Sequence, residues 1–101
     1  MSVVEEARSI APALTELFYD IHRCPELGRQ ERRTAALIRR RLEELGVEYV
    51  PLADTGTAAV IRGAKPGRTI GFRADIDALP ITEETGLPYA SQTPGVMHAC
   101  G

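Results

Sequence analysis

Apolar side chains recur at intervals of three and four residues through the first part of the chain. The members of this stripe are Val3, Ala7, Ile10, Leu14, Leu17, Phe18 and Ile21. Such spacing places the side chains on one face of an amphipathic helix. Pro12 interrupts the stripe, and a proline inside a helix removes a backbone hydrogen bond. The pattern therefore predicts either a helix kinked at Pro12 or a helix that starts with Ser9 as its cap.

The same periodicity resumes between about residues 29 and 45. Its apolar or small positions are Thr34, Ala35, Ile38, Leu42 and Leu45. Gly46 follows at the place where a left-handed residue commonly ends a helix. We therefore predict a second helix over this range.

Short stretches rich in β-branched residues follow the second helix, at residues 47–50, 57–62 and 69–74. Their composition, and the Gly and Pro residues that bound them, are typical of strands. The last two flank a Gly63–Gly67 turn signal, which predicts an antiparallel hairpin between them. Two helices followed by strands, with polar residues at strand ends, predict an α/β fold with its site in loops beyond the sheet.

Composition limits the classes of partner. The chain has 101 residues, of which 44% are hydrophobic, as expected for one small globular domain. Its net charge of -2 offers no electrostatic surface for nucleic acid or an anionic membrane. Glu31, Glu43 and Glu44 are interleaved with the arginines clustered at positions 29–41 on the predicted helix, and this pattern predicts a solvated helix face.

The beginning of the chain shows no secretion signal, and no apolar run approaches the roughly 18 residues of a spanning helix. We therefore expect a cytoplasmic protein. In a reducing compartment, Cys24 and Cys100 are not expected to form a disulfide. Cys24 is interpreted as a packed small side chain, and His22 as a helix-end residue that interacts with the helix dipole.

Asp75 and Asp77 follow the last predicted strand and are two residues apart, so both carboxylates could face one pocket. Paired carboxylates suit hard cations or the orientation of a histidine ligand. The spacing alone favours a plainer interpretation, in which one aspartate caps a turn and the other pairs with Arg73 or another surface arginine.

His98 and Cys100 are also two residues apart, in a loop that contains glycines. A thiolate and an imidazole could begin a transition-metal site, but such sites require three or four protein ligands. Taken alone, the pair is more typical of an ordinary loop. A nucleophilic thiol assisted by the histidine is a further alternative.

Several strings in fixed order carry more information than any single motif. They are Asp20–Leu27 (DIHRCPEL), Thr34–Ile38 (TAALI), Leu45–Gly46, Pro66–Gly67, Phe72–Ile81 (FRADIDALPI), Thr85–Ser91 (TGLPYAS) and Pro94–Gly101 (PGVMHACG). Together they resemble the N-terminal part of the metal-dependent amidohydrolase family that contains hippurate hydrolase, N-acyl-amino-acid amidohydrolases and indole-acetyl-amino-acid hydrolases. Aminoacylase and carboxypeptidase G are related to it.

This resemblance implies that residues 1–101 form the N-terminal portion of a catalytic domain, a three-layer α/β/α sandwich like that of zinc exopeptidases. The rest of that domain and a smaller lid domain, which often mediates dimerisation, would lie outside the chain. The family uses divalent ions such as Mn, Zn, Ni or Co to hydrolyse the amide bond of N-acyl amino acids. Because the family's later ligands and its catalytic glutamate are absent, we expect these residues alone to be metal-free and inactive.

The resemblance also assigns roles to individual residues. Cys100 matches a metal ligand, and a bound thiol is deprotonated outright. Asp75 stands where carboxypeptidase-like cousins carry a ligand histidine, as is usual in the acyl-amino-acid branch. Asp77 and His98 are then the residues expected to support the site. The segment from Cys24 to Glu31 is interpreted as structural.

A second hypothesis belongs to a different class of function. In it, the chain is a shortened, non-catalytic α/β module that keeps the fold and acts in binding or regulation.

Overall fold

The computed structural model describes residues 1–100. The chain divides into two compact units. One unit joins residues 1–25 to the segment from Ala78 onward, and the other comprises Glu26–Asp77. Each unit is described below by itself.

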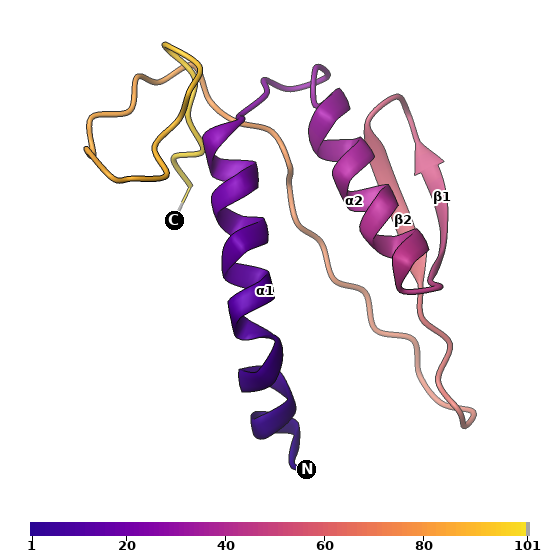
Figure 1. Cartoon of the computed structure of the whole chain (residues 1–101). Helices are drawn as coiled ribbons and strands as arrows, with labels where there is room; N and C mark the ends of the chain where they lie inside the picture. The colour runs from indigo at the N-terminus through magenta and orange to yellow at the C-terminus, as the bar shows by residue number, and fades with distance from the viewer. Residues whose placement is uncertain (101) are drawn as a thin grey trace. The chain divides into compact units, whose positions relative to one another are not determined.

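The first unit begins with helix α1, Val3–Arg23 (Figure 1). Ser2 caps it, because the Ser2 hydroxyl accepts a hydrogen bond from the backbone N–H of Glu5 and the Glu5 carboxylate accepts one from the backbone N–H of Ser2. The helix runs through Pro12, so the predicted start at Ser9 is wrong. The capping box at Ser2 defines the start of the helix there, and Pro12 lies within it. None of the helix's residues is buried, and Leu14 and Phe18 of its apolar stripe are 53% and 56% exposed.

The second unit begins with helix α2, Arg32–Glu44. It starts later than predicted, because Glu31 adopts a non-helical conformation and makes no side-chain cap. The Glu26 carboxylate takes the place of a cap, and accepts hydrogen bonds from the backbone N–H groups of Arg33 at 3.0 Å and Thr34 at 2.6 Å. Gly46 follows the helix with a φ of 68°, as the sequence predicts for its terminator.

Strands β1, Glu48–Leu52, and β2, Gly56–Val60, form a two-stranded antiparallel sheet. In their register Glu48 pairs with Val60 and Leu52 with Gly56, so the turn consists of residues 53–55. The α/β character and the presence of a hairpin are as predicted, and so are two of the three strand positions.

The predicted pairing is wrong. Residues 69–74 form no strand, and the hairpin turn lies before β2 rather than after it. The cause is that residues 69–74 have no strand beside them in the described chain, so Ile70 and Phe72 are 77% and 97% exposed. The sequence signal for the observed turn is Asp54-Thr55-Gly56. Glycine is needed at position 56 because a Cβ there would lie 2.7 Å from the Leu52 carbonyl oxygen.

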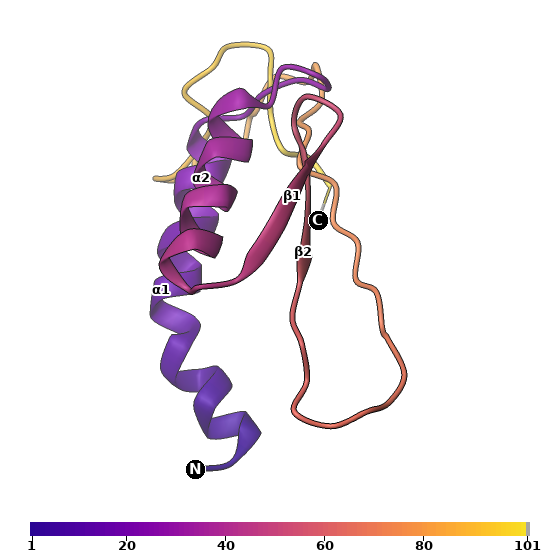
Figure 2. The same cartoon turned by 90° about the vertical axis from the view of Figure 1, so that its right-hand side faces the viewer.

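Helix α2 lies along the hairpin in both views (Figures 1 and 2). Its buried residues Thr34, Ala35 and Leu37 form most of the small core of this unit. Arg39 joins the helix to the turn, because its Nε donates to Thr57 Oγ1 at 3.0 Å and its Nη2 donates to the Gly56 carbonyl at 2.8 Å. Arg39 is therefore an exception to the prediction that the arginines form a solvent-exposed helix face.

Beyond β2 the described chain has neither helix nor extended sheet. An antiparallel bridge joins Leu79 and Met97 in the first unit. Neither α1 nor α2 combines the length and the hydropathy needed to span a bilayer.

Candidate functional site

The segment that carries the predicted ligand leaves the Leu79–Met97 bridge directly. His98 is half-buried, and its ring centroid lies 6.5 Å from that of His22 on α1. Cys100 is an exposed free thiol. An exposed thiol at the end of an ordered loop is accessible to a metal ion or to another part of a larger site.

The two aspartates lie in the other unit, and both are exposed. Asp75 Oδ1 accepts a hydrogen bond from Arg73 Nε at 3.1 Å, which is the surface pairing that the spacing favoured. The Asp77 carboxylate lies beside Gly28, with Oδ2 3.7 Å from the position of a Cβ added there. Within residues 1–100, no group of three His, Cys, Asp or Glu side chains is placed to hold a metal ion.

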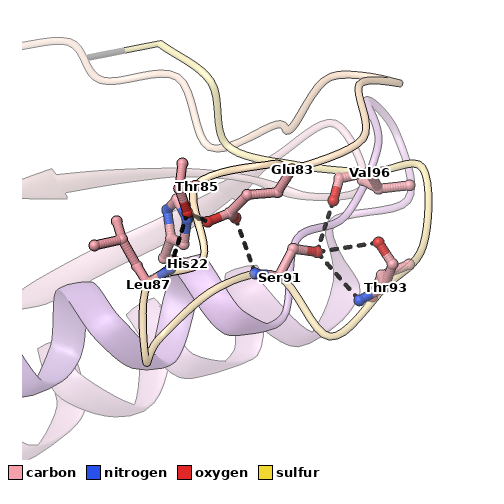
Figure 3. A network of polar contacts seen from close by, with 7 residues as sticks. All are labelled: His22, Glu83, Thr85, Leu87, Ser91, Thr93 and Val96. Atoms are coloured by element: carbon pink, nitrogen blue, oxygen red, sulfur yellow. Dashed lines mark hydrogen bonds and ion pairs between the residues drawn. The ribbon is translucent and has the colours of Figure 1, made fainter.

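A buried carboxylate that the sequence did not single out organises the loop before His98 (Figure 3). The Glu83 side chain is 3% exposed, and its Oε1 lies 2.8 Å from Nε2 of His22. Glu83 also accepts hydrogen bonds from the backbone N–H of Ser91 at 2.9 Å and from the hydroxyl of Thr85. Since a carboxylate only accepts, the His22 Nε2–H is the donor in the first pair.

These donors stabilise the charged form of Glu83. Hydrogen bonds from the Thr85 hydroxyl and the Ser91 amide, followed by the interaction with His22, lower the pKa of Glu83 below its ordinary value of 4.5. The sequence offered no signal for this role, because Glu83 stands beside Glu84 in a polar loop. His22 lies in the last turn of α1, as predicted, and from there its side chain also contacts Glu83.

Aromatic rings pack around the same end of α1. Tyr89 stacks on Tyr19, with ring centroids 4.1 Å apart, and meets His22 edge to face at 5.6 Å. Tyr89 and Tyr19 also line an open, mainly apolar groove along α1, together with Phe18 and Leu14. Cys24, at the C-terminal cap of α1, is half-buried, in keeping with its interpretation as a packed small side chain.

Several known proteins are similar to this chain in sequence. The profile described as peptidase family M20/M25/M40 matches residues 71–101. The N-acetyldiaminopimelate deacetylase of Oceanobacillus iheyensis is 49% identical over 90 residues, which are 87% of this chain and 24% of that protein. The N-acetyl-L-cysteine deacetylase of Bacillus subtilis is 52% identical over 82 residues, which are 80% of this chain and 20% of that protein.

Solved structures share the fold as well. A dinuclear metal-binding peptidase of the M20 family from Bacillus subtilis superimposes with a TM-score of 0.85 at 45% identity, covering 92% of this chain and 27% of its own. The chain is similar to members of the M20 peptidase family. A second structure, from methicillin-resistant Staphylococcus aureus, gives a TM-score of 0.90 at 42% identity over 98% of this chain and 27% of its own. The chain thus spans about a quarter of the length of the M20 relatives it matches.

The M20 relationship implies divalent metal ions, and the described residues meet that requirement only in part. The accessible Cys100 thiol suits a divalent transition metal. One thiolate cannot fix a coordination geometry, and the described residues place no group of three ligands. The described part of the chain therefore does not form a metal site by itself.

Proposed function

We propose that this chain forms the first part of the catalytic domain of a metal-dependent amidohydrolase that cleaves N-acyl amino acids. The observation that carries the proposal is the 49% and 52% identity to two deacetylases of N-acetylated amino acids. The family match over residues 71–101 also contains the proposed ligand and both aspartates. The substrate class is therefore a small acylated amino acid, hydrolysed in the cytoplasm.

Cys100 is the proposed metal ligand, and its exposure at the end of an ordered loop supports this assignment. Bound divalent ions in such enzymes polarise water and the substrate carbonyl. His98 is proposed to support the ligand segment, and its half-buried ring beside His22 gives it a fixed place. The supporting role of Asp77 depends on the resemblance alone. Asp75, paired with Arg73, has no proposed ligand role.

Sequencing the gene past the codon for Gly101 is the first test. A reading frame that continues with His-Asp and later with a pair of glutamates supports the hydrolase. A stop codon there contradicts it and favours the second candidate, a non-catalytic α/β module. That candidate is supported by the lack of a three-ligand group among residues 1–100.

The second test uses the product of the longer reading frame, assayed with N-acetylated amino acids. We expect Cys100→Ser to reduce both kcat/KM and the metal content, and Cys24→Ser, the matched control, to change neither. A chelator should abolish activity, and added metal should restore it. If Cys100→Ser keeps its metal and its full rate, the ligand assignment is wrong. Alkylation that inactivates an enzyme insensitive to chelator would indicate a thiol hydrolase instead.

A further inference from the structure

The loop between Leu79 and Met97, called here the anchored loop, leaves and returns at a single bridge. Leu79 N–H donates to the Met97 carbonyl at 2.9 Å, and Met97 N–H donates to the Leu79 carbonyl at 3.0 Å. The His98–Cys100 segment continues from this bridge without any intervening residue. Whatever fixes the anchored loop therefore also fixes the direction in which the segment leaves it.

Two contacts attach the anchored loop to the C-terminal end of α1. The first is the pair formed by His22 and Glu83, whose side chains are only 11% and 3% exposed. The second is a hydrogen bond from the backbone N–H of Gln92 to the Arg23 carbonyl at 2.8 Å. Because α1 is a regular helix, it provides a rigid support for the loop.

Ser91 connects Glu83 to the bridge (Figure 3). Its backbone N–H donates to Glu83 Oε1, and its hydroxyl donates to the Val96 carbonyl at 2.6 Å. Val96 is the residue immediately before Met97 of the bridge. Polar contacts thus lead from the end of α1 through Glu83 and Ser91 to Val96, and the backbone continues from Val96 through Met97 to the His98–Cys100 segment.

We propose that Glu83 is a positioning residue, whose carboxylate sets the direction of the His98–Cys100 segment through Ser91 and the Leu79–Met97 bridge. The consequence for catalysis rests on the proposed function, because it requires Cys100 to be a ligand. The positioning itself involves only contacts within the described residues.

Several groups face Glu83. On the loop these groups are the Thr85 hydroxyl and the Ser91 amide, and on α1 the group is His22. The His22 ring in turn lies beside the rings of Tyr89 and His98. Because the folded-state pKa of Glu83 is lowered, its interactions are fully present above 4.5 and are lost as the pH falls through the folded value.

The test is a pH titration of the full chain by NMR from pH 6 downward, with ¹⁵N amide signals and the Glu83 side-chain carboxyl signal recorded together. We expect the amide chemical shifts of His98 and Ala99 to change together with the Glu83 carboxyl signal, in a single titration step with its midpoint below pH 4.5. Glu83→Gln should abolish this step. Glu84→Gln, the matched control beside it, should retain it. A wild-type chain without the step, or a step that persists in Glu83→Gln, would overturn the proposal.

A second variant keeps the carboxylate and changes only a donor, in case Glu83→Gln fails to fold. Thr85→Val removes the hydrogen bond that contributes most to lowering the pKa of Glu83. The midpoint of the His98 and Ala99 step should therefore move to higher pH, together with that of Glu83. A midpoint that moves at Glu83 but not at His98 and Ala99 would contradict the coupling.

The outcome is independent of whether Cys100 binds metal. We expect Cys100→Ser to leave the step unchanged, because the thiol takes no part in the contacts that transmit it. Failure of the proposed function would be seen in the metal content and activity of the longer protein. Failure of the positioning proposal would be seen in these metal-free titrations.

Discussion

At the scale of single residues, carboxylates do more to organise this chain than its sequence suggests. Glu26 precedes α2 in the chain, and its carboxylate accepts hydrogen bonds from backbone N–H groups in the first turn of the helix. These N–H groups have no partner within the helix. It also accepts a hydrogen bond from the Thr34 hydroxyl at 2.7 Å. Partial burial raises the pKa of Glu26, but the hydrogen bonds from Thr34 and Arg33 outweigh it, so the pKa is lowered overall.

Glu26→Ala should therefore lower the free energy of unfolding by about 1 kcal/mol near neutral pH, the usual cost of a lost helix cap. Since the folded-state pKa lies below 4.5, the difference from wild type should shrink as the pH falls below that value. Urea unfolding at a series of pH values measures both effects. Glu16→Ala, at an exposed position in α1, is the control and should change little. A Glu26 effect that does not vary with pH would argue against the cap.

Gly56 is required for a different reason, the close approach of the Leu52 carbonyl. Gly56→Ala should destabilise the hairpin by about 1–3 kcal/mol, as overpacking does elsewhere. Gly71→Ala is the matched control, because no atom lies within 4 Å of its added Cβ. Urea midpoints of the two variants should differ clearly, and equal midpoints would contradict the steric explanation.

At the scale of elements, α1 depends on its first residues, because no residue of this 21-residue helix is fully buried and its aromatic packing involves Tyr19 and His22 near its C-terminal end. Capping and local side-chain pairs therefore contribute to the stability of its N-terminal end. Hydrogen bonds from the backbone and hydroxyl of Ser2 lower the pKa of Glu5, so this end of the helix is also sensitive to acid below 4.5.

Ser2→Ala should reduce the helicity of α1 and cost about 1 kcal/mol. Circular dichroism at 222 nm and thermal unfolding measure the change. Ser9→Ala is the control, since the Ser9 hydroxyl donates only to the Glu6 carbonyl within the helix and alanine is the better helix former. If both variants melt alike, the capping box contributes nothing.

Both helices and two of the strands could be predicted from periodicity and composition, because each depends on residues close in sequence. The hairpin pairing could not. It was decided by contacts such as the Arg39 bonds to the turn and by the lack of a partner for Ile70 and Phe72. Periodicity shows which stretches can be strands, but not which strands are present to pair with them.

The candidate site divides in the same way. Cys100, His98 and both aspartates were proposed from motifs and stay predictions, whereas Glu83 was not proposed, because its role arises only from burial and from a partner distant in sequence. For Asp75 the simple surface pairing with Arg73 proved to be the observed one. Motifs in the sequence proposed the residues, but their neighbours could be known only from the fold.

At the scale of the whole molecule, residues 61–75 are exposed and belong to no helix or strand. Trypsin should therefore cut first after Arg62, Arg68 or Arg73, while Lys65 should resist because Pro66 follows it. Brief digestion followed by mass spectrometry of the fragments gives the order of cleavage. A first cut within α2, for example after Arg40, would show that this exposed segment is better protected than the helix.

The anchored loop also has a practical consequence for protein engineering. Its two ends are joined by backbone hydrogen bonds, and Gly86 within it is an exposed residue with a φ of 69°. Closure entropy grows only with the logarithm of loop length, so doubling the loop would cost about 0.6 kcal/mol. A reporter peptide inserted at Gly86 could thus be displayed to solvent while the base of the loop keeps its shape.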